Sequence, residues 1–325
     1  MTAVQKLARR RVTPPAPPDS DRAAYRATLL DLARRDPRIW CLDSDMGGLE
    51  KQFEAELPGQ YVDVGIAEAN LMSVAAAVAA EGMLPFVNTM AAFASARALE
   101  QVKIDIAYHG LPVRVVGTHS GFSAAHLGPT HHAQQDLAVM RSMPNLTVMT
   151  PADVGETVRM VTAAAYLPGP VYLRLGRNAT PPVYSEETKF TVGEAISLRD
   201  GGDVTIVAAG ALPVRLALDA AERLAAQGHA ARVLNMHTIK PLDVAALVAA
   251  AEQTAGVVTV EDHSVLGGLG GAVAEALAEH RPAPVRRVGM ADAFCPHPGT
   301  HAEQLAAAGV SADAVVTAAL AVLHR

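Results

Sequence analysis

The stretch VGIAEANLMSVAAAVAA, residues 64–80, decides the fold expected of this chain. Only Glu68, Asn70 and Ser73 are polar in it, so a helix that begins near Glu68 is apolar on nearly every side and is expected to be buried. A buried carboxylate costs several kcal/mol unless it is paired or hydrogen-bonded. Glu68 therefore either caps the helix, where the macrodipole is worth up to about 1 kcal/mol to it, or has a catalytic role. The segment alone leaves both readings open.

Extended and helical patterns alternate on both sides of this helix, as they do in a parallel sheet with crossover helices. Extended runs are expected at residues 38–42, 61–64, 84–89, 112–118, 146–149 and 171–175, with helices at 22–35, 91–108, 133–142 and 153–167. A second series has strands at 203–208, 231–235, 256–261 and 285–288, with helices at 212–227, 243–252, 269–280 and 311–323. The pattern predicts an α/β fold of two domains, each a mostly parallel sheet flanked by helices.

Four segments follow from this reading. Residues 1–20, basic and then rich in proline, are expected to form a flexible N-terminal arm. Residues 21–178 form the first domain and 191–325 the second. Residues 179–190, which contain a Thr-Pro-Pro turn and a short acidic run, are expected to form a linker.

Composition excludes several classes of function. Of the 325 residues 50% are hydrophobic and 18% charged, and the net charge of −6 predicts no nucleic-acid partner. The only cysteines, Cys41 and Cys295, lack the spacing of a zinc site, so we expect no metal ligands in this chain and a reducing cytoplasm. No apolar run is judged long enough to span a bilayer, so no membrane partner is expected.

The segment Gly65-Ile66-Ala67-Glu68-Ala69-Asn70 resembles the pyrimidine-binding domain of transketolases and of deoxyxylulose-phosphate synthase. In that family the matching glutamate hydrogen-bonds the aminopyrimidine of thiamine diphosphate and shifts it to the imino tautomer that activates the cofactor. The resemblance implies that Glu68 is catalytic and that Glu68 and Ile66 bind the cofactor.

Two further segments resemble cofactor-binding parts of the family. Residues 86–97 are similar to a segment whose aromatic side chains pack on the aminopyrimidine ring, and Phe93 matches such a position. The turn Asp43-Ser44-Asp45-Met46 resembles one whose second aspartate lies near the thiazolium ring, which implies the same for Asp45. Alternatively, Phe93 is a core residue and Asp45 a local turn cap.

The sequences Thr118-His119-Ser120-Gly121 and Gly128-Pro129-Thr130-His131 follow a predicted strand end, where α/β sheets place ligands. The resemblance implies that His119 contacts a substrate phosphate and that His131 contacts substrate hydroxyls and assists proton transfer. It also implies a phosphate contact for Arg177, and His126 lies in the same segment as the two histidines. We therefore expect His119 and His131 to be catalytic, and His119, His126, His131 and Arg177 to bind substrate.

The sequence departs from the family at two substrate positions. Leu127 replaces an aspartate that recognises a sugar hydroxyl, and Leu49 replaces a phosphate-binding serine. A site that lacks a hydrogen-bonding partner discriminates strongly against the group it no longer binds. The two leucines indicate altered specificity or lost activity, and they leave the acceptor open.

The family binds magnesium and the diphosphate through Gly-Asp-Gly and an Asn-rich loop, and neither occurs here. The resemblance, over residues 22–325, therefore implies that an N-terminal subunit supplies the diphosphate site and Mg²⁺, in an α2β2 heterotetramer. It implies transfer of a two-carbon ketol unit from a ketose to an aldehyde, with small sugar or aldehyde substrates. The alternatives are the beta subunit of a 2-oxo-acid dehydrogenase or of an acyloin-forming enzyme, and a non-catalytic paralogue.

Overall fold

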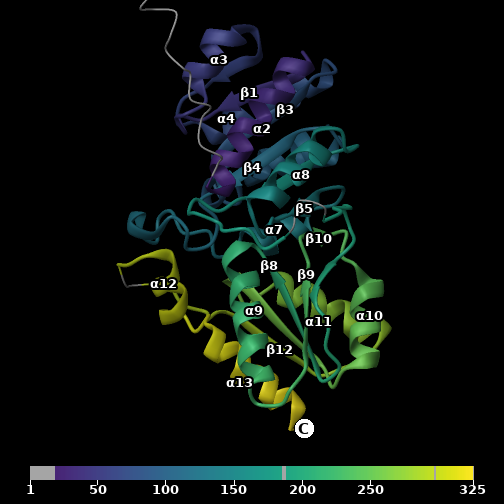
Figure 1. Ribbon diagram of the computed structural model, residues 1–325. Helices are drawn as coiled ribbons and strands as arrows, with labels where there is room; N and C mark the ends of the chain where they lie inside the picture. Colours follow the sequence, from purple (N-terminus) through teal and green to yellow (C-terminus); the bar gives the residue numbers. More distant parts are fainter. Residues whose placement is uncertain (1–18, 185–187, 296–297, 325) are drawn as a thin grey trace, which may run out of the picture.

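Two α/β domains lie one above the other in Figure 1, with the first domain in purple to teal and the second in green to yellow. The structure is a computed structural model that describes residues 19–184, 188–295 and 298–324. Each domain has a mostly parallel sheet with helices on both faces, so the predicted fold class is confirmed. Residues 1–18 of the predicted N-terminal arm lie outside the described residues.

The first sheet has seven strands in the order β10-β5-β6-β4-β3-β1-β2. Their bounds are β1 Ile39–Asp43, β2 Tyr61–Asp63, β3 Leu84–Met90, β4 Arg114–Thr118, β5 Thr147–Met149, β6 Val171–Arg174 and β10 Thr238–Lys240. All neighbours pair in parallel except β10, which runs antiparallel to β5. Strand β10 belongs to the second half of the chain, and the sequence pattern did not predict it.

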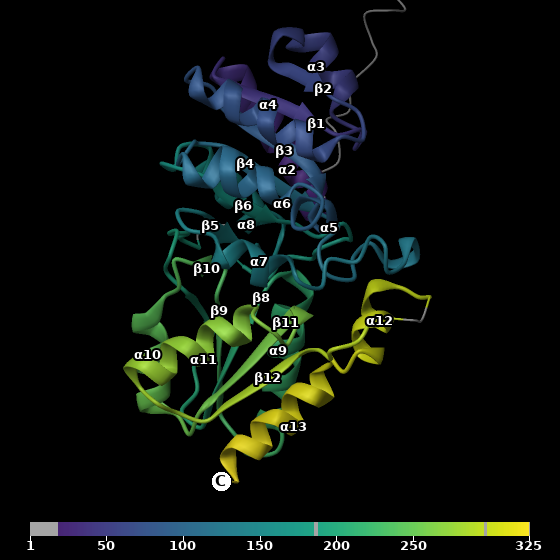
Figure 2. The same ribbon diagram turned by 180° about the vertical axis from the view of Figure 1, so that it is seen from behind.

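Helices cover both faces of the first sheet. Helices α2 (Asp21–Arg35) and α8 (Val154–Ala165) pack on one face, which is turned to the viewer in Figure 1. Helix α4 (Glu68–Ala80) lies on the other face, seen in Figure 2. The domain also contains α3 (Glu50–Glu56), α7 (Asp136–Ser142) and 3₁₀ turns at Pro58–Gln60 and Ala125–Leu127.

Helix α4 is buried on one side only, so the expectation of a helix buried all round was wrong. Leu71 and Met72 face the core, whereas Asn70, Ala77 and Ala80 are exposed. Small apolar residues such as those of α4 occur both in protein cores and at protein–protein contacts. Composition alone does not distinguish the two.

The helix predicted at residues 91–108 is broken into α5 (Ala91–Ala94), α6 (Leu99–Gln101) and a π-helical segment, Val102–Tyr108. Helix α5 is capped at its C-terminus by Ser95, whose backbone N–H and hydroxyl both donate to the carbonyl of Ala91, at 3.1 and 2.8 Å. The break lies between Phe93 and α6, and it contains Arg97.

The second sheet has five strands in the order β12-β11-β8-β9-β7, and only β7 runs antiparallel, to β9. Its elements are β7 Ile196–Arg199, β8 Val204–Ala209, β9 Ala231–Asn235, β11 Val257–Ser264, β12 Val285–Met290, α9 Ala211–Ala225, α10 Val244–Gln253, α11 Leu269–His280, α12 His301–Ala307 and α13 Ala312–Leu323. Helices α9 and α13 pack on one face, and α10 and α11 contribute to the core on the other. The sequence pattern missed β7 and α12.

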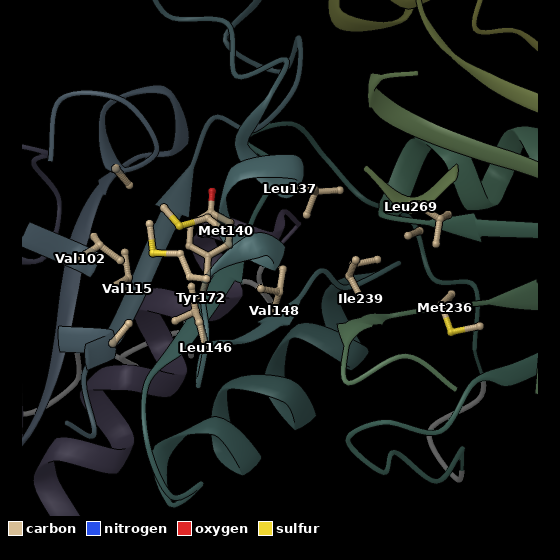
Figure 3. Close-up of a cluster of buried hydrophobic side chains, with 14 of the residues drawn as sticks. Val102, Val115, Leu137, Met140, Leu146, Val148, Tyr172, Met236, Ile239 and Leu269 are labelled. Carbon is tan, nitrogen blue, oxygen red and sulfur yellow. The ribbon is translucent and has the colours of Figure 1, made fainter. Parts of the chain in front are cut away.

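One hydrophobic cluster runs through both domains. Met236, Ile239 and Leu269 of the second half belong to the same buried cluster as Leu137 and Tyr172 of the first, as Figure 3 shows. With β10 in the first sheet, this cluster fixes the two domains against each other.

The segment His301–Leu323 has the length and apolar composition of a membrane-spanning helix, contrary to the expectation stated above. The structure divides it into α12 and α13, and α13 packs its buried side chains, among them Val315 and Ala319, on the second sheet. Its apolar character is accounted for by the core of a globular domain.

Candidate active site

The register of the first sheet brings the predicted site loops to one edge. Strands β3 and β4 pair in parallel, with Met90 opposite Thr118. Helix α5, which carries Phe93, follows β3 directly, and His119 follows β4. Because carboxyl ends of parallel strands share an edge, the two segments leave the sheet side by side.

Glu68 opens helix α4, and its side chain is 2% exposed. Arg97 Nη1 donates to Glu68 Oε1 at 3.0 Å and to Oε2 at 2.9 Å. The preceding residue, Ala67, has no side chain to cap the helix, so the positive end of the α4 dipole also acts on the carboxylate. The sequence analysis predicted the burial of Glu68 but not its counter-ion.

Arg97 joins Glu68 to the aromatic part of the site. Its guanidinium lies 4.3 Å from the centre of the Phe93 ring. The Phe93 ring in turn contacts His131 edge to face, with 5.3 Å between ring centres. The structure thus connects Glu68, Arg97, Phe93 and His131 in that order, and these four residues are called the group around Arg97.

His119 is buried at the end of β4 in a left-handed conformation, with φ of 57°. Its Nδ1 lies 2.9 Å from the Thr118 hydroxyl. Burial lowers the pKa of His119 to about 3, and the positive charges of Arg22, Arg177 and Arg26 lower it further in the same direction. At neutral pH the imidazole is uncharged and lies among three arginines.

Arg22 and Arg26 are functional candidates that the sequence analysis missed. Burial, and then the charges of Arg26 and Arg177, lower the pKa of Arg22 to about 10. Both side chains donate to carbonyls of the turn after β1, those of Met46 and Gly47. The two arginines lie one turn apart on α2. Their spacing just after the Ser20 cap was the feature of the sequence that could have identified them.

The turn after β1 places its two aspartates differently. Asp43 is buried and accepts from the backbone N–H groups of Ser44 and Met46, at 2.8 and 3.1 Å, and burial raises its pKa to about 6. Asp45 is exposed in a left-handed conformation, with φ of 58°. Leu49, at the position of the family's serine, is 2% exposed and lies beside Arg22 in a small pocket.

Ile66 and His126 belong neither to the group around Arg97 nor to the group around His119. The side chain of Ile66, next to the start of α4, is 72% exposed. His126 is also exposed, and it lines a cavity between the two domains rather than contacting Phe93 or Glu68 in any described interaction. Arg177 lies in the other group, close enough to His119 to lower its pKa.

The residues around Arg97 fit the pyrimidine half of thiamine diphosphate. A buried carboxylate acceptor and an aromatic ring stand on either side of a single arginine, and both come from the edge where the sheet binds ligands. Among residues 19–184, 188–295 and 298–324, no group of three or more His, Cys, Asp or Glu side chains could hold a metal ion.

Comparison with known families gives matches to both halves of the chain. Residues 20–182 match the transketolase pyrimidine-binding domain, and residues 193–315 match the transketolase C-terminal domain. The chain is 46% identical over 275 residues to the 6-deoxy-6-sulfo-D-fructose transketolase subunit of a Clostridium species, covering 84% of this chain and 85% of that one. It is 41% identical over 302 residues to an apulose-4-phosphate transketolase subunit of Phocaeicola vulgatus, covering 92% and 96%.

Solved structures agree with these matches. A split-gene transketolase, described as an inactive beta4 tetramer, has a TM-score of 0.88 and 42% identity, covering 94% of this chain and 99% of that one. The transketolase of Campylobacter jejuni has the same fold, with a TM-score of 0.77 and 22% identity over 98% of this chain and 51% of its own length.

The two-domain α/β fold and the matches to both of its halves define a subunit of the transketolase class. The chain belongs to the transketolase family, with the pyrimidine-binding and C-terminal domains of that family in one polypeptide. The prediction of a split transketolase subunit is confirmed at this level.

Proposed function

We propose that this chain forms the pyrimidine-binding half of a thiamine diphosphate site in a cytoplasmic split transketolase. A partner chain, the N-terminal transketolase subunit, contributes the diphosphate site and Mg²⁺, and two copies of each form an α2β2 heterotetramer. The complex transfers a two-carbon ketol unit from a ketose donor to an aldehyde acceptor. The observation that carries the proposal is the buried Glu68 carboxylate at the start of α4, which Arg97 connects to the ring of Phe93.

Glu68 is the proton-handling residue of this half-site. Bound thiamine diphosphate supplies the carbon nucleophile that ketol transfer needs. Glu68 Oε1 or Oε2 would accept a hydrogen bond from the pyrimidine, and Arg97 holds the carboxylate in place through two hydrogen bonds. Phe93 offers its ring as a packing surface, and we keep Asp45 and Ile66 as proposed cofactor contacts.

An exposed apolar surface beside the site supports the partner subunit. Ile66 is 72% exposed, and Ile104 and Tyr108 of the neighbouring π-helical segment are 45% and 76% exposed. Residues with such large exposed apolar side chains, next to a binding site, mark a protein contact. We infer that the N-terminal subunit covers Ile66 and completes the cofactor site there.

A substrate with a terminal oxyanion suits the second group of residues. Arg22, Arg26 and Arg177 are close enough to His119 to lower its pKa, and a phosphate or sulfonate would neutralise part of their positive charge. The relatives named above act on a sulfo sugar and on a sugar phosphate, which is consistent with this site. His119 and His131 would hydrogen-bond the substrate and move its protons.

The test uses the full chain assembled with an N-terminal transketolase subunit, thiamine diphosphate and Mg²⁺. Ketol transfer from a phosphorylated ketose to an aldehyde is compared for wild type, Glu68→Gln and Glu81→Gln. Glu81 is exposed at the end of α4, so its variant is a matched control for charge and location. We expect Glu68→Gln to lower kcat at least about 100-fold and Glu81→Gln to leave it unchanged.

Three results would contradict parts of the proposal. Wild-type turnover by Glu68→Gln would remove the catalytic assignment of Glu68. Activity of the chain without a partner would refute the split site. Acetyl transfer from pyruvate without ketol transfer would favour the 2-oxo-acid dehydrogenase or acyloin-forming alternative.

A further inference from the structure

A cavity of about 660 Å³ lies between the two domains. The loops after β4, β5 and β6 of the first sheet line it, and so does the start of α9, directly after β8 of the second sheet. The carboxyl ends of strands from both sheets thus face the same space, and this is the edge at which α/β sheets bind ligands. Its volume is that of a site for a small molecule. Glu68, Phe93, His119, His131 and Arg177 do not line it.

The N-terminus of α9, a helix of 15 residues, opens into this cavity. Gly210 precedes the helix with φ of 90° and carries no side chain to cap it. The backbone N–H groups of Ala211 and Leu212 therefore have no helical partner, and Pro213 has no N–H to offer. Two free donors and the positive end of the helix dipole face the same point.

The hydroxyl of Thr150 is a second, independent feature of the site. Thr150 lines the cavity and is 2% exposed, and its hydroxyl makes no hydrogen bond with any described residue. The hydroxyl lies 3.5 Å from the point where a side chain on Gly210 would begin, so it is directed at the helix N-terminus. The hydroxyl is therefore free to donate a hydrogen bond to a ligand in the cavity.

Arg215 adds a positive charge from the second turn of α9. It lines the cavity, is exposed, and makes no hydrogen bond or ion pair within the described part of the chain. The two carboxylates that line the cavity already accept hydrogen bonds from other residues of the protein. Asp21 accepts from Thr157, Thr180 and the N–H of Gly176, and Asp262 accepts from the N–H of Phe122 and from His301.

We propose that this cavity is a second ligand site, which binds a small phosphate ester. The phosphate lies at the N-terminus of α9 and accepts from the N–H groups of Ala211 and Leu212, from the Thr150 hydroxyl and from Arg215. The ester group extends between the domains toward His126. Because the ligand touches both domains, its binding stabilises their present arrangement.

The experiment measures binding of inorganic phosphate and of glycerol 3-phosphate to the full chain by calorimetry, at constant ionic strength. The protein carries Arg177→Gln, so that the arginine group around His119 contributes less to the signal. Arg215→Gln is compared with Arg286→Gln. Arg286 is an exposed arginine on β12 that lies outside the cavity lining, which makes it a matched control.

We expect glycerol 3-phosphate to bind at one site and Arg215→Gln to weaken it about tenfold, the loss expected for one charge-assisted hydrogen bond. Arg286→Gln leaves the affinity unchanged. Ala211→Pro provides a second variant, because proline is tolerated at the first helical position and removes one of the two free donors. It is expected to weaken binding several-fold.

Three outcomes would overturn the proposal: no binding, equal binding by Arg215→Gln and Arg286→Gln, or binding that Ala211→Pro leaves unchanged. These outcomes do not bear on ketol transfer, because the experiment measures binding alone and Ala211, Arg215 and Arg286 belong to neither group of the candidate active site.

Discussion

The ion pair between Glu68 and Arg97 can be measured in the isolated chain by a double-mutant cycle. Glu68→Gln and Arg97→Met are made singly and together, and the free energy of unfolding of each is compared with wild type. The same cycle on Arg34 and Glu56 is the control, because that pair also has two hydrogen bonds between its side chains but is exposed.

The expected magnitude follows from the burial of the partners. Exposed ion pairs contribute about 0–1 kcal/mol, whereas breaking a fully buried pair costs about 3–5 kcal/mol. The Glu68 side chain is 2% exposed and that of Arg97 is 50% exposed, so we expect an intermediate coupling of about 2 kcal/mol. The Arg34–Glu56 side chains are 47% and 42% exposed, which predicts a coupling below about 0.5 kcal/mol.

Urea titrations at pH 7.5, in low and in high salt, give the four free energies of each cycle. Salt should reduce the coupling of the exposed pair more than that of Glu68 and Arg97. Arg97→Lys should keep much of the stability, because a single nitrogen, Nη1, contacts both oxygens of Glu68. A Glu68–Arg97 coupling no larger than that of the exposed pair would refute the argument that the buried carboxylate depends on Arg97.

Three further predictions concern other buried or charged groups. Arg174→Met should cost about 3–5 kcal/mol in a denaturant titration, because it leaves the carboxylate of Asp136, 0% exposed, without its cation; a loss below about 1 kcal/mol would contradict this. Burial lowers the pKa of His237 from 6.5 to about 4. Its contribution to the free energy of unfolding is therefore fully present above pH 6.5 and is lost as the pH falls toward 4. His237→Gln should therefore remove about 3 kcal/mol of pH dependence from unfolding free energies measured across that range, and an unchanged profile would exclude His237 as the cause. In the assembled complex, Arg177→Gln should raise the KM for a phosphorylated substrate about tenfold with little change in kcat; equal loss with an uncharged substrate would show that Arg177 does not read the anion.

Most of the fold could be predicted because periodic apolar patterns specify strands and helices locally. The elements that were missed are short or depend on distant partners. Strand β10 has only three residues, and it pairs with β5, which is distant in the sequence. A local sequence pattern does not show such a pairing. The break within residues 91–108 is a local change of backbone conformation, which apolar periodicity does not register.

Site residues that lie in family motifs could be predicted from the sequence. Charged residues whose partners are distant in the sequence could not. Glu68 was singled out by a carboxylate in an apolar segment, and its burial is confirmed. Arg97, Arg22 and Arg26 were not singled out, because the sequence does not show that Arg97 pairs with Glu68 or that Arg22 and Arg26 donate to the turn after β1. The catalytic and binding roles of Glu68, His119 and the other named residues stay predictions until the variants are assayed.

Strand β10 ties the second half of the chain into the sheet of the first half. A protease cut between β6 and β7 would therefore leave two fragments that still share a sheet and one hydrophobic cluster. The fragments should remain together until the sheet itself opens. Unfolding should accordingly be a single cooperative transition, in which neither domain melts ahead of the other.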